Sequence, residues 1–186
     1  MDIWSAITAR RSIKAFADRP VDREAIEQLL AAAVHAPNHR LTQPWRFLVL
    51  GPAARRAFGE VLGARKAKKI EDPAAAQATI EKVAAAEAAI PVTIAVSVVV
   101  DANPEVREED YAATMMAVQN ILLAAHDLGL GTHLRSGAVM DDPRTRAALA
   151  IPDGERVVVM IWVGYAASVP EAKPRKGAAE LTRWLP

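Results

Sequence analysis

Apolar residues recur at the three- to four-residue spacing of a helix in two segments near the amino terminus. The first covers residues 3–9 and is short. The second covers about residues 23–34 and follows Asp22, whose carboxylate can accept hydrogen bonds from the free N–H groups of a first helical turn. Proline cannot continue a helix, so we expect this helix to end before Pro37 and a loop to extend over residues 37–44.

Runs of β-branched and aromatic residues predict the strands. Residues 45–50 and 156–163 form two such runs, and residues 132–134 form a shorter one. The run at 92–100 is apolar almost throughout, which is typical of a central strand buried on both faces. Helical patterns rather than hairpin turns separate the strands, and this order favours an α/β or α+β sheet covered by helices.

Other helices differ in character. Residues 108–128 are apolar on nearly every side, so this helix is expected in the core or in a subunit interface, with Gly129 as its left-handed cap. Residues 74–90 are rich in alanine and poor in bulky side chains, which predicts a peripheral helix. Asp142 and Pro143 begin a small helix, and the tail over residues 166–186 is expected to be irregular.

Composition limits the class of protein. The chain has 186 residues, 52% of them hydrophobic, and is expected to form one domain over residues 1–186. The 23 Lys and Arg residues balance 22 Asp and Glu residues, so no strong field draws the chain to nucleic acid. Cysteine is absent, which excludes disulfides and thiol catalysis. No signal-peptide pattern is present, and the apolar run at 90–100 is too short to cross a membrane, so we expect a soluble, cytoplasmic protein.

Polar residues gather beside helix ends at three places. Two arginines, a hydroxyl and a lysine follow the first helix, and such a set suits a phosphate and a polar sugar chain. Paired arginines after a short helix also serve as solvated or capping residues, and that alternative stays open. The three places are Arg10-Arg11-Ser12-Ile13-Lys14, Ala36-Pro37-Asn38-His39 with Gln43-Pro44-Trp45, and Gly129-Leu130-Gly131 with Arg135-Ser136-Gly137.

In combination these segments resemble the nitroreductase family. Its members begin with Arg-x-Ser-x-Lys or Arg and continue with an Ala-Pro-Ser-x-x-Asn-x-Gln-Pro-Trp loop. A later helix rich in Gln-Asn-x-x-Leu-Ala-Ala is closed by Gly-Leu-Gly, and a Lys-Pro-Arg-Lys segment follows near the end. The matching residues are Arg10-x-Ser12-x-Lys14, Ala36-Pro37 with Gln43-Pro44-Trp45, Gln119-Asn120-Ile121-Leu122-Leu123-Ala124-Ala125, Gly129-Leu130-Gly131 and Lys173-Pro174-Arg175-Lys176.

The resemblance implies an α+β fold, with a central mixed, mainly antiparallel sheet covered by helices, in an intertwined homodimer. It also implies one FMN at each subunit interface. The phosphate would lie on Arg10, Arg11 and Arg175, Ser12 near the ribityl or phosphate oxygens, and Lys14 beside the isoalloxazine. The other implied contacts are His35, Pro37, Asn38 and His39 from the partner subunit, and backbone N–H groups of Leu134, Arg135, Ser136 and Gly137.

The chain departs from the family pattern in the second motif. Asn38 and His39 stand where the pattern has two serines, and Leu41 stands where it has asparagine, which removes one polar contact to the flavin. With these differences, the chain resembles a short, minimal branch of the family. The aromatic flap of longer members has no clear counterpart, and residues 74–90 occupy its approximate place.

The activity implied is transfer of hydride from NADH or NADPH to FMN and then, by a ping-pong mechanism, to a nitroaromatic, quinone or similar acceptor. No side chain needs to act as a nucleophile. A relative that fragments its flavin or dehalogenates a substrate, and a flavin-binding protein without turnover, stay open as alternatives. Two histidines lie four residues apart, but Pro37 between them breaks the helix that would present both to a metal, so no metal site is expected.

Overall fold

The apolar runs of the sequence form one sheet in the computed structural model, which describes residues 2–186. The strands lie in the order β1-β2-β4-β3, so β2 is flanked on both sides, as its apolar pattern predicted. All neighbouring strands are antiparallel, and within the described residues one isolated parallel bridge joins Ser12 to Thr132 at the edge of the sheet. The predicted α+β class is confirmed. The strands are β1 (Trp45–Leu50), β2 (Val92–Val99), β3 (Gly131–Arg135) and β4 (Glu155–Gly164).

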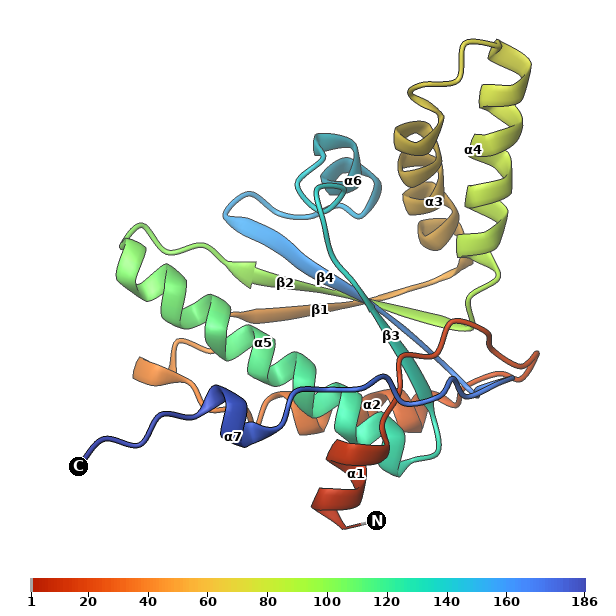
Figure 1. Cartoon of the computed structure of the whole chain (residues 1–186). Coiled ribbons are helices and arrows are strands. Elements are labelled where there is room, and N and C mark those ends of the chain that lie inside the picture. The colour runs from red at the N-terminus through yellow and green to blue at the C-terminus, as the bar shows by residue number, and fades with distance from the viewer. Residues whose placement is uncertain (1) are drawn as a thin grey trace.

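Two hydrophobic layers cover the sheet, one on each face (Figure 1). On one face Leu29 and Ile121 pack in the same cluster as Ile94 of β2. On the other face Phe58 and Met160 are fully buried, in a cluster that contains Ala95. Ile94 and Ala95 face opposite clusters because successive side chains of a strand alternate. The helices of the two layers are α2 (Arg23–Ala33) and α5 (Pro104–Asp127) on the first face, and α3 (Pro52–Ala67) and α6 (Pro143–Ala148) on the second.

The alanine-rich segment forms α4 (Pro73–Ala88), which packs against α3 as a helical hairpin beside one end of the sheet (Figure 1). A Cβ atom on Gly59 would lie 2.7 Å from the Cα atom of Ala84, and one on Gly63 would lie 2.8 Å from the Cα atom of Ile80. The helices therefore approach so closely that only glycine fits at these α3 positions. Most of α4 is exposed, so the predicted peripheral helix is confirmed.

The long helix α5 begins at Pro104, earlier than the predicted start near residue 108. The side chain of Asn103 accepts a hydrogen bond from the backbone N–H of Glu105 at 3.0 Å, and Pro104 occupies the first helical position, where its missing N–H costs nothing. In residues 2–186 no helix, α5 included, combines the length and the apolar composition that crossing a bilayer requires.

Two other local predictions are wrong in detail. Asp22 stands at the N-cap position of α2, but its carboxylate makes no capping hydrogen bond, although the end of α2 at Ala33 agrees with the predicted end near residue 34. The tail contains one helical turn where an irregular segment was expected. The short helices are α1 (Ile3–Ala9), η1 (His39–Leu41) and α7 (Ala178–Leu181).

Asp142 is the N-cap residue of α6, and its nearly buried carboxylate accepts several hydrogen bonds. Arg144 donates to it from its side chain at 2.8 Å and from its backbone N–H at 3.0 Å, and Arg65 donates at 3.3 Å. The Arg144 side chain, more than its backbone N–H, holds the pKa of Asp142 well below the ordinary carboxyl value, and Arg65 lowers that pKa further.

Replacing Asp142 by Asn keeps an N-capping oxygen but removes the charge. Since the stabilisation from a depressed pKa is complete only above the unfolded-state value, near pH 4, we expect the variant to be less stable than the native chain at pH 7. The stability difference should shrink as the pH falls from about 5 toward 2. Urea unfolding at pH 7 and pH 3 measures it, and an equal difference at both pH values would contradict the role of the charge.

Candidate functional site

The segment after α1 is held beside β3 by a backbone hydrogen bond and by close packing. The N–H of Ile13 donates to the carbonyl of Thr132 at 2.8 Å. The Ile13 side chain is buried against Gly131, where a Cβ atom would lie only 2.6 Å from Ile13 Cγ1. Because neighbouring side chains of an extended segment point to opposite sides, burial of Ile13 turns Ser12 and Lys14 outward, and both line a cavity.

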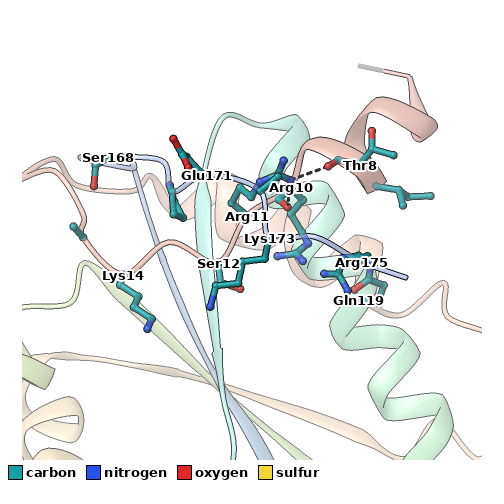
Figure 2. A pocket seen from close by; sticks show the side chains of 14 residues that line it. Thr8, Arg10, Arg11, Ser12, Lys14, Gln119, Ser168, Glu171, Lys173 and Arg175 are labelled. Atoms are coloured by element: carbon teal, nitrogen blue, oxygen red, sulfur yellow. Dashed lines mark hydrogen bonds between the residues drawn. The ribbon is translucent and has the colours of Figure 1, made fainter. Parts of the chain in front are cut away.

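The carboxyl-terminal segment returns to the same place. The N–H of Ala167 donates to the carbonyl of Ala15 at 3.0 Å, and Ala166 forms an antiparallel bridge with Phe16. From there residues 168–175 continue past α1 to α5, where Arg175 lies beside Gln119 (Figure 2). A cavity of about 950 Å³ lies among these elements, within the size range of small-molecule sites.

Positive charge is concentrated in this cavity, as Figure 2 shows. Five cationic side chains line it, together with one carboxylate, that of Glu171. Within residues 2–186 none of the five forms a salt bridge. Such a set favours a bound anion, because the anion would offset the repulsion among the cations. The five cations are Arg10, Arg11, Lys14, Lys173 and Arg175.

Arg10 has the most perturbed environment of the cavity. Its side chain is half-buried, and burial lowers the pKa of its guanidinium below the ordinary arginine value. The positive charges of Arg175 and, to a smaller extent, Arg11 lower that pKa further. The structure therefore brings Arg10 and Arg175, which are far apart in the sequence, into one electrostatic group.

Arg11 also has a structural contact. Its Nη1 atom donates to the carbonyl of Thr8 at 2.8 Å and to that of Arg10 at 3.0 Å. These carbonyls lie at the end of α1, where backbone oxygens lack helical partners. The capping role left open for the arginine pair thus applies to Arg11, whose guanidinium still borders the cavity.

The loop predicted to face a partner subunit lies outside the cavity lining. The side-chain oxygen of Asn38 accepts from the backbone N–H of Gln43 at 2.6 Å, and His39 Nδ1 lies 2.9 Å from Glu109 Oε1. These contacts fasten the loop to itself and to α5. The four predicted residues of this region are His35, Pro37, Asn38 and His39.

The residues at the end of β3 also lie outside the cavity lining. The guanidinium of Arg135 forms an ion pair with Glu87 of α4 and lies over the Trp162 ring, 4.6 Å from its centroid. The Arg135 side chain is therefore held by protein groups, and Trp162 is only partly buried. Of the neighbouring residues, Leu134 packs against the core, and Ser136 and Gly137 are exposed.

Three residues that the structure makes prominent were not among the predicted site residues. Gln119 and Lys173 line the cavity, and both belong to motifs that carried the family resemblance, which was the available signal. Gln119 borders the cavity while the adjacent Asn120 donates to the carbonyl of Ala32 at 3.1 Å. Glu87 was missed altogether. The available signal in the sequence was its spacing: Glu87 follows Ala84 by three positions, so both residues lie on the same side of this alanine-rich helix, which is the buried side.

Comparison with known proteins places this arrangement in a family. The sequence profile of the "Nitroreductase family" matches residues 7–165. YfhC of Bacillus subtilis (strain 168), whose name assigns it to the NAD(P)H nitroreductases, is 32% identical over 91% of this chain and 87% of its own length.

Solved structures show the same fold. A nitroreductase-like protein from Bacillus cereus is 27% identical and superposes with a TM-score of 0.87 over 100% of this chain and 96% of the other. A protein of this type from Desulfovibrio desulfuricans, solved in complex with FMN, is 28% identical, with a TM-score of 0.75 over 100% of this chain and 98% of the other. By the extent of the profile match and by its likeness to these relatives, the chain belongs to the nitroreductase family of oxidoreductases.

Proposed function

We propose that this chain binds FMN in the cavity described above and uses it to pass electrons from NADH or NADPH to an electron-poor acceptor. The observation that carries the proposal is the group of five cations without salt bridges within residues 2–186, among them half-buried Arg10. The chemistry of the cavity fits the cofactor, because guanidinium groups bind phosphate through paired N–H donors, and the volume of about 950 Å³ admits a nucleotide. The FMN complex of the Desulfovibrio desulfuricans relative supports the same choice.

The residues of the chain divide into two roles. Arg10, Arg11 and Arg175 bind the phosphate and fix its position, and Ser12 offers a hydroxyl to the phosphate or ribityl oxygens. Lys14 lies further along the same segment (Figure 2). Its role in the proposal is to supply a positive charge toward the isoalloxazine. Bound FMN supplies hydride chemistry, and a fixed cation favours its reduced form because reduction adds negative charge to the ring. No side chain is required as a nucleophile.

The proposed functional unit is a homodimer with FMN at the interface. Large apolar side chains are exposed at both ends of the chain, including Trp4 at 72% and Trp184 at 90%. Exposed aromatic residues in such number favour burial in an interface. In the dimer, the loop with Pro37, Asn38 and His39 would reach the partner's cofactor, in agreement with its place outside the cavity lining of its own chain.

The absorption spectrum of the purified protein tests this proposal directly. We expect a yellow protein, or one that becomes yellow with added FMN, that runs as a dimer in light scattering. It should oxidise NADH or NADPH faster when a nitroaromatic or quinone is present. Double-reciprocal plots of initial rate against NADH or NADPH concentration, made at several acceptor concentrations, should give parallel lines, as a ping-pong order requires. Free FMN at the same concentration is the control.

Three results would contradict the proposal in different ways. A colourless monomer that takes up no FMN would refute cofactor binding. A flavin-loaded protein without NAD(P)H oxidation would favour a binding protein. Loss of the flavin itself, or release of halide from a substrate, detected by chromatography of the products, would instead favour the fragmenting or dehalogenating alternative.

A further inference from the structure

A buried carboxylate on α4 connects this helix with strands β3 and β4. Glu87 is 4% exposed, and both of its carboxylate oxygens are used. One pairs with Arg135 Nη1 at the end of β3, and the other accepts from Trp162 Nε1 of β4 at 3.2 Å. The Arg135 guanidinium also lies over the Trp162 ring, so the three side chains form a closed set.

The strand that carries Arg135 is paired with the segment that carries Lys14, because the backbone N–H of Ile13 donates to the carbonyl of Thr132 at 2.8 Å. His133, two residues before Arg135, stacks on Trp162 with ring centroids 5.1 Å apart. Burial lowers the pKa of His133, and the next largest causes are the charges of Lys14 and Arg135. Lys14 lines the cavity, so His133 lies within the electrostatic range of both a cavity cation and Arg135.

Charge balance distinguishes the two cations. Arg135 has a buried acidic partner, whereas Lys14 forms no salt bridge within the described chain. Without Glu87, a second unbalanced positive charge would act on the region around Lys14 and His133. The pair therefore limits the positive potential at this end of the cavity.

We propose that Glu87 is a positioning residue of the flavin site, which fixes Arg135 over Trp162 and offsets its charge, so that Lys14 is left to set the positive potential that acts on the flavin. This inference rests on the proposed function. Glu87 acts through Arg135 and needs no contact with FMN or substrate. Its charge decides how strongly the site favours reduced over oxidised FMN.

A double-mutant cycle on the FMN-loaded protein tests the inference. Glu87→Gln keeps an oxygen for hydrogen bonding but leaves Arg135 unbalanced, and it should raise the ratio of reduced to oxidised bound flavin about tenfold at a fixed applied potential. Arg135→Gln should lower that ratio, because it leaves the negative charge of Glu87 without its cation. The double variant should return to within about threefold of the native ratio. Spectroelectrochemical titration measures all three ratios.

Glu81→Gln provides a matched control on the same helix. Glu81 pairs with Arg56 at 2.6 Å on the exposed side of the α3–α4 hairpin, outside the cavity lining. Its replacement also removes one partner of a salt bridge, and it should leave the flavin ratio unchanged. Single variants at Glu87 and Arg135 that shift the ratio in the same direction, or a double variant that does not recover, would overturn the proposal and indicate a purely structural pair.

A second measurement does not depend on flavin. NMR titration of the histidines in the flavin-free protein should show a lower His133 pKa in Glu87→Gln and a higher one in Arg135→Gln, because the first change exposes a positive charge and the second removes it. An unchanged His133 pKa in both variants would refute the charge pair itself. A protein that binds no FMN but shows both shifts would refute the proposed function and the tuning role, while confirming the pair.

Discussion

Replacing Arg10 by Gln is expected to weaken FMN binding by about 10- to 100-fold, the loss associated with one charge-assisted hydrogen-bonding partner. Arg10 is half-buried beside Arg175 and Arg11, and these cations repel one another. A bound phosphate would offset this repulsion. Fluorescence titration of the flavin-free protein with FMN measures the change. The melting temperature without flavin should not fall, because the substitution removes a repulsion rather than a favourable contact.

Arg107→Gln is the matched control for this prediction. Arg107 is an exposed residue of α5 outside the cavity, and its replacement should leave FMN affinity unchanged. Equal FMN affinity in the native and Arg10→Gln proteins would show that the phosphate does not bind at this cluster. A similar loss of FMN affinity in Arg10→Gln and Arg107→Gln would indicate a long-range charge effect instead of a defined contact.

Replacing Gly59 by Val is expected to destabilise the protein by about 3 kcal/mol, at the upper end of overpacking costs. The new Cβ atom would lie 2.7 Å from Ala84 Cα and 2.9 Å from Glu87 Cβ, and the backbone atom cannot move without shifting α4. Helix propensity works in the opposite direction, since glycine is the poorer helix former, but by less than about 1 kcal/mol. The steric effect therefore dominates, and the melting temperature should fall by about 6–12 °C.

Ala85→Val controls for the introduction of valine. Ala85 is an exposed residue of α4 next to the contact position Ala84, and its replacement should cost less than about 1 kcal/mol. Calorimetric melting of both variants makes the comparison. A Gly59→Val protein as stable as the native chain would mean that α3 and α4 separate easily, and that the close approach of the hairpin contributes little to the fold.

The sequence by itself determined the elements whose pattern is local. The strand at 45–50 and the helix at 3–9 agree with their predicted bounds because alternation and helical periodicity are properties of a few consecutive residues. The same holds for Arg10, Ser12 and Lys14, which line one cavity because they share one short segment around a buried isoleucine. Motif resemblance added the family, which the comparisons confirm.

Tertiary structure alone decided what depends on contacts between distant segments. The order β1-β2-β4-β3 and the meeting of Arg175 with Arg10 require the chain to return from β4 past α1, which no local pattern encodes. Glu87 has the composition of a surface residue in an alanine-rich helix, and only the packing of α4 against the sheet end turns it into a buried partner of Arg135. Periodicity reports which face of a segment is buried, whereas the partner on that face is set by the packing of the whole chain.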